Sequence, residues 1–413
     1  MSSLRHVIVV GASLAGLRAC ETLRQEGFDG TLTLVGAETE VPYDRPPLSK
    51  KLLAGEWEAD RIRLRKQEDF DSLALTLRLG VRAVGLDTAA RTLALSDGST
   101  LAFDGLIIAT GAAPRRLPDQ PALDGIVELR TLADALDLRN RIAGGTARVA
   151  VIGAGFIGLE AAATARALGC AVTVLEGAPS PLIRGLGVEM GAAVASVHAR
   201  HGVDLRCGVQ VAGIEGSDGR ATGVRLGDGS LVDSDVVLVG IGVAPATEWL
   251  AGSELELRDG IVCDATLNTG VPGVYAAGDC ARWPNGVFAG FDDEEMRVEH
   301  WTNAAEQGAA AAANLLAVAR GEQPTPYRSV PFFWSDQFDS RIQFVGRAHG
   351  GDQVHVFAGN TDGAFAALYG YQGRLRGVLG VSVPKMVMPF RALLNAGATW
   401  HEALAKAAAL TAG

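Results

Sequence analysis

The stretch VAVIGAGFIGLEAAATARALGCAVTVLEG, from Val149 to Gly177, decides the fold of this chain. It combines a β-branched apolar strand, a glycine turn, a helix rich in alanine and leucine, and a second strand. Short apolar runs on both sides of such a helix are typical of a parallel sheet that is covered on both faces. A strand, a crossover helix and a second strand form a right-handed βαβ unit. The stretch therefore predicts an α/β domain.

The glycines of this stretch have the spacing of a dinucleotide-binding fingerprint. Gly153 is expected to make the tight turn, Gly155 to let the backbone approach a pyrophosphate, and Gly158 to let helix and strand pack closely. The pyrophosphate would lie at the helix N-terminus, where unpaired N–H groups and the helix dipole favour an anion. Glu176 ends the second strand, where its carboxylate can accept both ribose hydroxyls and would repel a 2′-phosphate. We therefore expect a site that prefers NADH to NADPH.

The same pattern occurs near the start of the chain, as VIVVGASLAGLRACETLRQEGFDGTLTLVG from Val7 to Gly36. Ser13 stands where the second glycine of the fingerprint is usual, and it is small enough to keep the close approach possible. The usual acid after the second strand is displaced, because Ala37 precedes Glu38. Glu38 is therefore the candidate for the ribose of a second dinucleotide.

A motif far downstream supports FAD as that second dinucleotide. In TGVPGVYAAGDCA, from Thr269 to Ala281, an apolar strand delivers Asp279 to a turn. Asp279 can bond a ribityl hydroxyl, and the N–H groups that follow can face a phosphate. Together with ATG at Ala109–Gly111, the order of motifs matches the two-dinucleotide flavoproteins of the pyridine nucleotide–disulfide oxidoreductase superfamily.

Three segments narrow the resemblance: VPYDRPPLSK at Val41–Lys50, RVEHWTNA at Arg297–Ala304, and FWSDQ at Phe333–Gln337. They resemble signatures of putidaredoxin reductase-like and ring-hydroxylating-dioxygenase ferredoxin reductases. The resemblance covers essentially the whole chain. It implies an enzyme that binds FAD, oxidises NADH and passes single electrons to a [2Fe–2S] ferredoxin, which supplies a cytochrome P450 or a dioxygenase.

The fingerprints and the resemblance together indicate two sets of cofactor-binding residues. The set expected to contact FAD is Gly11, Ser13, Ala15, Gly16, Glu38, Arg45, Lys50, Ala83, Ala109, Thr110, Gly111, Arg130, Gly278, Asp279 and Trp301. The set expected to contact NAD is Gly153, Gly155, Phe156, Ile157, Gly158, Glu160, Glu176 and Gly242. Phe156 is a candidate cover for the nicotinamide, with ordinary packing as the alternative. Trp301 either places its backbone N–H on the flavin or fills core.

The segment Glu40–Lys51 contains no cysteine, although disulfide reductases of the superfamily carry one or two near the flavin. Electrons on the flavin would therefore have to leave singly to an external acceptor. The resemblance implies that Lys50 and Glu160 form an ion pair beside the flavin and the nicotinamide. The alternatives are a solvated surface lysine and a carboxylate that interacts with the helix dipole.

An acidic ferredoxin calls for a basic docking surface. Arg63, Arg65 and Lys66 form the best local basic cluster, and Trp334 is a candidate for the same surface. Ordinary solvated surface is the alternative for such a short basic run.

The fold class expected is α/β, with two Rossmann-like nucleotide-binding domains and a smaller α+β C-terminal domain. We assign residues 1–110 and 246–326 to FAD, 111–245 to NAD and 327–413 to the C-terminal domain. The hairpin signals at Thr92–Leu95 and Leu101–Phe103 fall in the first of these. Alternating strands from about Arg328 and a helix at His401–Thr411 make up the last.

The composition sets limits on other functions. A net charge of −10 argues against a general nucleic-acid binder. The five cysteines show no zinc spacing, so no metal site is expected and each is expected to be a small buried residue. No secretion signal or bilayer-spanning stretch is evident, so we expect a cytoplasmic protein, a monomer or weak homodimer. Two alternatives stay open: a reductase of rubredoxin, a quinone or monodehydroascorbate, and, remotely, a non-catalytic flavoprotein like apoptosis-inducing factor.

Overall fold

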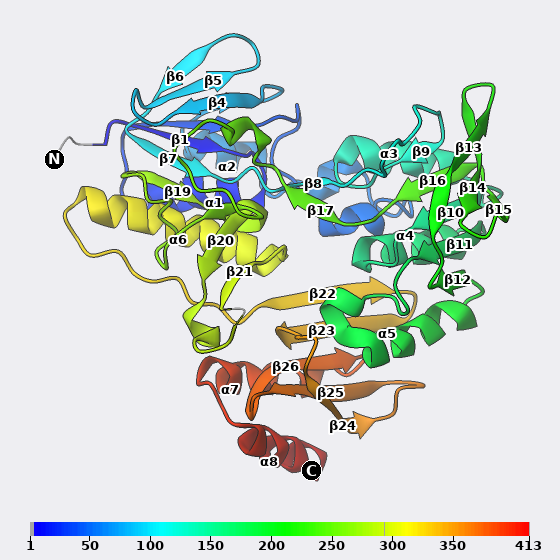
Figure 1. Ribbon diagram of the computed structural model, residues 1–413. Helices are drawn as coiled ribbons and strands as arrows, with labels where there is room; N and C mark the ends of the chain where they lie inside the picture. The colour runs from blue at the N-terminus through cyan, green and yellow to red at the C-terminus, as the bar shows by residue number, and fades with distance from the viewer. Residues whose placement is uncertain (1–3, 293, 413) are drawn as a thin grey trace. The chain divides into compact units, whose positions relative to one another are not determined.

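The structure is a computed structural model that describes residues 4–292 and 294–412. It divides into two compact units, coloured along the chain in Figure 1. Unit 1 comprises Met1–Asp44, Arg63–Ala113 and Ala244–Pro331. Unit 2 comprises Arg45–Ile62, Pro114–Val243 and Phe332–Gly413.

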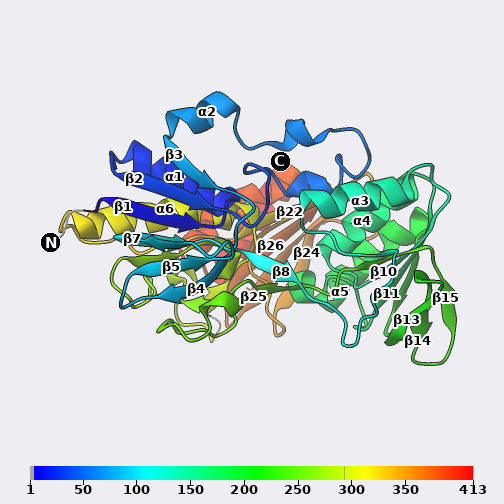
Figure 2. The same ribbon diagram turned by 90° about the horizontal axis from the view of Figure 1, so that it is seen from above.

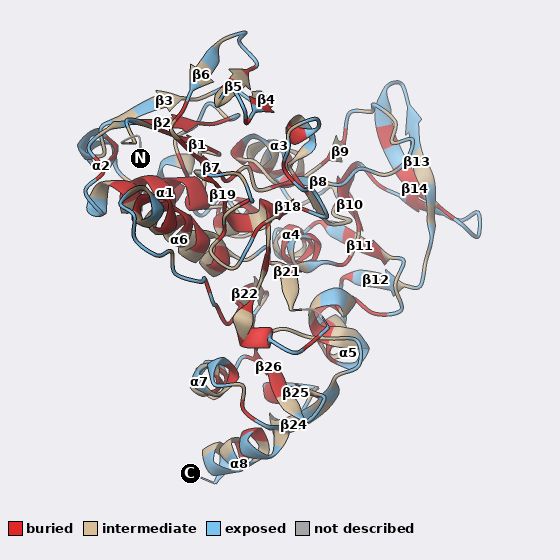
Figure 3. Ribbon diagram, turned by 60° about the vertical axis from the view of Figure 1, so that its left-hand side comes forward, coloured by how far each residue is buried: buried red, intermediate tan, exposed pale blue. Residues whose placement is uncertain are grey.

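Unit 1 is built on a parallel five-stranded sheet. In spatial order its strands are β19 (Val274–Ala276), β7 (Gly105–Ile108), β1 (His6–Val10), β2 (Thr31–Val35) and β3 (Leu75–Arg78). Helices α1 (Leu14–Gln25) and α6 (Trp301–Ala319) lie side by side against one face of it (Figure 1). A Cβ atom on Gly308 of α6 would lie 2.2 Å from the Ala15 carbonyl oxygen of α1, so only glycine permits this close approach. Strands β19, β7, β1 and β2 are buried almost throughout, as are the facing sides of both helices, whereas β3 at the edge of the sheet is not buried (Figure 3).

Smaller elements complete unit 1. The predicted hairpin is confirmed, within an antiparallel sheet of β4 (Ala83–Asp87), β5 (Thr92–Leu95) and β6 (Thr100–Ala102). A second small sheet contains β18 (Ile261–Val262), β20 (Ala281–Pro284) and β21 (Glu295–Arg297). The short helices are α2 (Gln67–Ser72), η3 (Glu248–Leu250), η4 (Gly278–Cys280) and η5 (Gly286–Phe288). Strands β8 (Ala112–Pro114) and β17 (Val243–Pro245) pair with each other.

Unit 2 repeats the parallel design around the second fingerprint. Its sheet runs β12 (Asp204–Cys207), β11 (Ala171–Glu176), β10 (Arg148–Ile152), β16 (Val236–Val239) and β9 (Ile126–Val127). The helices are η1 (Pro46–Ser49), η2 (Ala59–Ile62), α3 (Leu132–Ile142), α4 (Phe156–Ala167) and α5 (Ile183–Arg200). The antiparallel sheet β13 (Val211–Ser217), β14 (Arg220–Leu226) and β15 (Leu231–Asp233) covers the face opposite α4 (Figure 2). There Val224 and Val232 pack with Ile152 and Val237 in one core.

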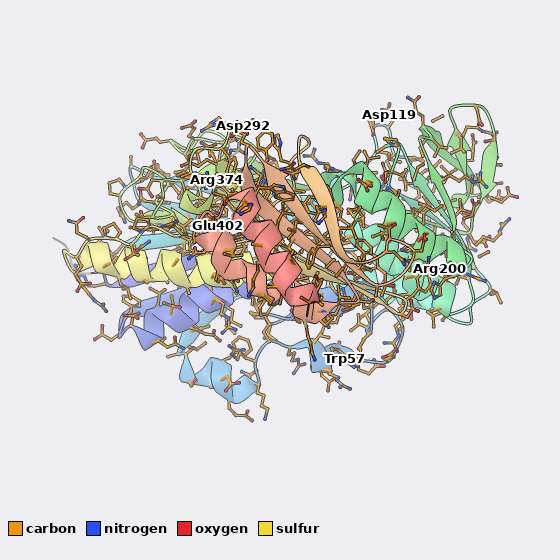
Figure 4. The ribbon with its side chains drawn as sticks, turned by 90° about the horizontal axis from the view of Figure 1, so that it is seen from below. Trp57, Asp119, Arg200, Asp292, Arg374 and Glu402 are labelled. Carbon is orange, nitrogen blue, oxygen red and sulfur yellow. The ribbon has the colours of Figure 1, made fainter. Side chains whose placement is uncertain are left out.

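The rest of unit 2 is an antiparallel sheet with short helices. Its strands are β22 (Phe332–Gln337), β23 (Ser340–Gly346), β26 (Arg374–Val381), β25 (Phe365–Tyr371) and β24 (Gln353–Gly359). The helices are η6 (Pro384–Met386), η7 (Met388–Phe390), α7 (Arg391–Asn395) and α8 (Trp400–Thr411). Thr399 forms a capping box with Glu402 that starts α8; Glu402 is labelled in Figure 4. Strands β25 and β26 are buried almost throughout rather than alternating, because helices pack against the sheet and Tyr369 bonds Leu186 of α5.

These sheets confirm the predicted fold class. The assignment of residues 1–110, 111–245, 246–326 and 327–413 to functional domains stays a prediction. Within the part of the chain that the structure describes, no helix is long and apolar enough to cross a membrane.

Candidate active site

The N-terminus of α4 has the geometry of a pyrophosphate cradle. Gly153 has φ +101°, and a Cβ atom there would lie 2.5 Å from the Gly240 carbonyl oxygen, so the turn requires glycine. A Cβ atom on Gly155 would meet nothing within 4 Å, which leaves open space in front of the helix. Gly155 is also the N-cap and has no side chain to cap the first N–H groups. These features fit a bound phosphate.

Glu176 lies at the end of β11 beside this turn. Its Oε2 accepts a hydrogen bond from the Ala154 N–H at 2.7 Å, and its Oε1 accepts one from the Ala178 N–H at 2.8 Å. A carboxylate has about four lone-pair sites, so acceptor capacity remains for ribose hydroxyls. The sequence did not single out Arg184, whose guanidinium lies 3.4 Å from the position of a Cβ atom on Gly242.

Lys50 and Glu160 are brought together within unit 2. The Lys50 Nζ lies 2.6 Å from the Glu160 Oε2, and the two side chains are 18% and 6% exposed. Lys50 is therefore a partly buried ion-pair partner and not a solvated surface lysine. Two serines that the sequence did not single out also donate to this carboxylate. Ser49 Oγ lies 2.5 Å from Oε2, and Ser335 Oγ lies 2.6 Å from Oε1.

Phe156 and Ile157, the first two residues of α4, differ in how far their side chains are packed. The Phe156 ring packs edge-on against Phe333, with centroids 4.7 Å apart, and lies against Gly185. Packing therefore accounts for its position. Ile157 is 42% exposed at the start of α4, which leaves its side chain accessible.

In unit 1 the first fingerprint meets the downstream motifs at the carboxyl ends of the parallel strands, the edge at which such sheets bind nucleotides. Gly11 has φ +120°, and a Cβ atom there would lie 2.0 Å from the Ala109 carbonyl oxygen. A Cβ atom on Gly278 would lie 3.2 Å from that of Ala15. Thr110 Oγ1 donates to the Ala246 carbonyl at 2.8 Å. Ser13 and Gly111 lie in the same turns, and Gly16 lies in the first turn of α1.

A buried amide completes this cradle. Gln307 of α6 is fully buried, and its Oε1 accepts a hydrogen bond from the Gly278 N–H at 2.8 Å. Its Nε2 is buried and has no hydrogen-bond partner among the described residues. Buried donors are nearly always satisfied, so an orphaned donor next to the predicted FAD motif fits a cofactor acceptor.

The predicted adenosine end of the FAD site contains a hydrogen bond that the sequence did not indicate. The hydroxyl of buried Tyr43 donates to the Glu38 carboxylate. Asp44 follows Tyr43 in the sequence, and its Oδ1 accepts a hydrogen bond from the Trp301 Nε1 at 2.7 Å. The indole therefore links the start of α6 to the PYDRPP segment. Neither of the two predicted roles of Trp301 included this bond.

Other residues of the predicted FAD set take part in hydrogen bonds that involve backbone atoms. Arg45 donates to the Arg130 carbonyl at 2.5 Å within unit 2. The Asp279 carbonyl accepts from Arg297 at 3.0 Å in unit 1. Ala83 begins β4 and pairs with Leu95.

The predicted docking residues differ in exposure. Arg63 and Lys66 are exposed, whereas Arg65 is half-buried and its Nε lies 2.6 Å from Glu21 Oε1. Helix α2 follows directly and carries three acidic residues, so the cluster is less basic than its sequence suggests. In unit 2, Trp334 of β22 stacks with Phe332 at 6.0 Å between centroids.

The cysteines are poor candidates for redox chemistry. Cys20, Cys170, Cys263 and Cys280 are buried, as predicted, and Cys207 is partly exposed. Burial raises the pKa of each of the five thiols, so little thiolate forms at neutral pH.

Two protein families match successive parts of the chain. Residues 5–308 match the pyridine nucleotide-disulphide oxidoreductase family. The chain belongs to this family. Residues 332–410 match the reductase C-terminal family, so the antiparallel sheet and the helices after it also have known relatives.

Several relatives of this chain are reductases of ferredoxin-type electron-transfer systems. Rhodocoxin reductase from Rhodococcus erythropolis is 40% identical over 390 residues, which cover 94% of this chain and 89% of the relative. The ferredoxin–NAD(+) reductase component of the p-cumate 2,3-dioxygenase system from Pseudomonas putida is 40% identical over 354 residues, with 85% and 83% coverage. The crystal structure of the covalent putidaredoxin reductase–putidaredoxin complex matches with a TM-score of 0.89 at 33% identity, covering 96% of this chain and 94% of that one.

These matches confirm the predicted resemblance to FAD- and NADH-dependent ferredoxin reductases and the predicted enzyme class, an oxidoreductase. Pyridine nucleotide-disulphide oxidoreductases of this type use FAD and NAD(P)H, which confirms the cofactor pair at that level. The roles of the individual site residues stay predictions.

Proposed function

We propose that this chain is an NADH:ferredoxin oxidoreductase that reduces a [2Fe–2S] ferredoxin serving a cytochrome P450 or a ring-hydroxylating dioxygenase. The observation that carries the proposal is the Lys50–Glu160 pair at 2.6 Å. Glu160 lies in the opening turns of α4, the helix whose N-terminus offers an open anion cradle at Gly155.

Each residue of this arrangement has a defined task. Bound FAD would accept a hydride and release electrons one at a time. Glu160 holds the Lys50 ammonium in place, and this cation would stabilise negative charge on a bound flavin. Because the five cysteines are free and form no disulfide, no cysteine offers an internal electron acceptor among the described residues. An external one-electron carrier is the consistent acceptor.

The preference for NADH rests on Glu176. Two backbone N–H groups hold its carboxylate at the end of β11, so a 2′-phosphate at that position would meet a fixed negative charge. The name of one relative, a ferredoxin–NAD(+) reductase component, supports the same choice.

The carrier would dock through exposed basic residues, of which Arg63 and Lys66 are the candidates; Trp334 stays a predicted contact. Arg65 contributes less, because it is half-buried and pairs with Glu21, a carboxylate that it shares with Arg18. We further propose that the chain acts in the cytoplasm as a monomer or weak homodimer.

The deciding experiment is NADH-dependent cytochrome c reduction by the FAD-loaded protein, with and without [2Fe–2S] ferredoxins from several systems. We expect strong stimulation by a ferredoxin with NADH and little activity with NADPH. Rapid bleaching of the flavin without stimulation by any ferredoxin would refute the ferredoxin as acceptor. Absence of bleaching by NADH would refute the hydride-transfer role of the Lys50–Glu160 pair.

A further inference from the structure

A chain of buried hydrogen bonds leads from the Glu160 carboxylate into the C-terminal antiparallel sheet. Ser335 Oγ lies 2.6 Å from Glu160 Oε1, and Gln337 Nε2 lies 3.0 Å from Ser335 Oγ. His198 Nε2 lies 2.8 Å from Gln337 Oε1. The side chains of Ser335, Gln337 and His198 are fully buried. The chain of bonds thereby joins α4, β22 and α5 within unit 2.

The donor and the acceptor of each hydrogen bond in this series follow from Glu160, where the series begins. Glu160 is paired with Lys50 and can only accept, so Ser335 donates its hydroxyl proton and accepts from the Gln337 amide nitrogen. The Gln337 carbonyl oxygen then faces His198 and needs an N–H there. His198 must therefore carry its proton on Nε2, and its Nδ1 is buried with no partner among the described residues.

The surroundings of His198 keep this arrangement neutral and rigid. Burial lowers the pKa of the His198 imidazole, with a smaller contribution from nearby His201. The Phe338 ring packs edge-on against His198 at 5.3 Å and stacks on His201 at 3.9 Å between centroids. His201 is itself 3.9 Å from Asp339. A neutral ring with its proton on Nε2 can donate to Gln337. The ring cannot turn freely, because Phe338 packs against it.

The two oxygens of Glu160 are held by different parts of unit 2. Oε2 accepts from Lys50 and Ser49, which belong to the segment Arg45–Ile62. Oε1 accepts from Ser335, the one hydrogen-bond donor to that oxygen among the residues that the structure describes. Without the Ser335 hydroxyl, a buried carboxylate oxygen would lose its donor and the carboxylate could rotate, and Lys50 would move with it.

We infer that Ser335 is a positioning residue for the Lys50–Glu160 pair, and that Gln337 and His198 hold its hydroxyl in the donating orientation. This inference rests on the proposed function, because it takes the pair as the group that assists hydride transfer from NADH. It gives the C-terminal sheet a role in the reaction. Residues 335 and 337 lie on the same face of β22, where Ser335 bonds Glu160 and Gln337 bonds Ser335.

The test is anaerobic stopped-flow reduction of the FAD-loaded protein at saturating NADH. Ser335→Ala should lower the limiting rate of flavin reduction about tenfold, since small misplacements of a reacting group are costly. The Kd for NADH and the FAD content should stay within about twofold of wild type. Ser335→Thr, which keeps the hydroxyl, should recover most of the rate. Ser340→Ala, on the neighbouring strand, is the matched control and should match wild type.

A double-mutant cycle separates positioning from general damage to the fold. If Ser335 acts through Glu160, Ser335→Ala should change the rate less than about twofold in a Glu160→Gln background. An equal loss in both backgrounds, or an unchanged rate for Ser335→Ala, would overturn the inference. So would a Glu160→Gln variant as fast as wild type. If NADH fails to reduce the flavin of the wild-type protein, the proposed function falls first, and this inference with it.

A second measurement does not depend on activity. Imidazole ¹⁵N chemical shifts of the holoenzyme should show His198 as the neutral Nε2–H tautomer at neutral pH, with assignment by comparison with His198→Gln. The Nδ1–H tautomer, or a charged ring, would contradict the direction of the hydrogen bonds and overturn the inference.

Discussion

Replacing Gly158 with alanine tests how closely α4 packs on the fingerprint turn. The added Cβ atom would lie 2.4 Å from the Gly153 carbonyl oxygen and 3.3 Å from Val151 Cγ1, where ordinary contact begins at 3.4 Å. The first overlap involves backbone at a residue with positive φ, so it cannot be relieved by a side-chain rotation. Such overpacking costs about 1–3 kcal/mol. Alanine in place of glycine in a helix regains about 1 kcal/mol. Because the overlap is with a backbone oxygen, we take the upper end of the overpacking range, about 3 kcal/mol, and expect a net loss of about 2 kcal/mol in the free energy of unfolding.

Gly155→Ala is the matched control, three residues earlier in the same segment. A Cβ atom there would meet no protein atom within 4 Å, and Gly155 has an ordinary φ of −77°. The free energy of unfolding should therefore change by less than about 0.5 kcal/mol. The methyl group would instead occupy the space through which a pyrophosphate approaches the backbone, so the Kd for NADH should rise at least about tenfold.

Urea unfolding of the FAD-loaded proteins, followed by circular dichroism, gives the stability difference, and a fluorescence titration gives the Kd for NADH. The two variants should show opposite phenotypes. If Gly158→Ala is as stable as Gly155→Ala, the packing argument is refuted. If Gly155→Ala binds NADH as tightly as wild type, the pyrophosphate does not approach α4 at this position.

Two further substitutions test charges at the site. Glu176→Ala should lower the ratio of kcat/KM for NADH to that for NADPH at least about tenfold, because it removes the charge that repels a 2′-phosphate; an unchanged ratio in steady-state kinetics would contradict the assignment. Burial lowers the pKa of His198 below its ordinary 6.5, so the unfolded chain binds this proton more readily and stability should fall as the pH drops below 6.5. His198→Gln should flatten that fall in pH-dependent urea unfolding, and an identical slope in both proteins would exclude His198 as its source.

Much of the fold could be predicted because the deciding signals are local. The turn glycines Gly11 and Gly153 stand between apolar strands and helices, and both have the positive φ that such turns require. The Asp97-Gly98 turn likewise marked the β5–β6 hairpin within one residue of its position. Each of these signals involves neighbours in the chain, which the sequence displays directly.

The support of Glu160 could not be predicted because its donors are distant in sequence. Ser335 lies 175 residues from Glu160, and Gln337 lies 139 residues from His198. A serine two residues before a glutamine in a strand indicates only that both side chains share one face. The FWSDQ segment marked this strand as part of a family signature, but which polar group it meets depends on the packing of β22 against α4 and α5.

For the basic cluster, too, the sequence does not show which side chains are paired in the fold. Along the chain, Arg63, Arg65 and Lys66 resemble a docking patch for an acidic partner. In the fold, Arg65 pairs with Glu21 of α1, a carboxylate that also binds Arg18, so the charge of Arg65 is partly offset. Arg63 and Lys66 stay exposed. Steering of a ferredoxin should then depend on these two side chains and be insensitive to removal of the whole pair in the double variant Arg65→Gln/Glu21→Gln, which leaves the net charge unchanged. The check is the ionic-strength dependence of ferredoxin reduction, measured for variants of Arg63 or Lys66 and for the variant that lacks the Arg65–Glu21 pair. Only the first kind should lose part of this dependence, because only exposed, unpaired charges steer the partner.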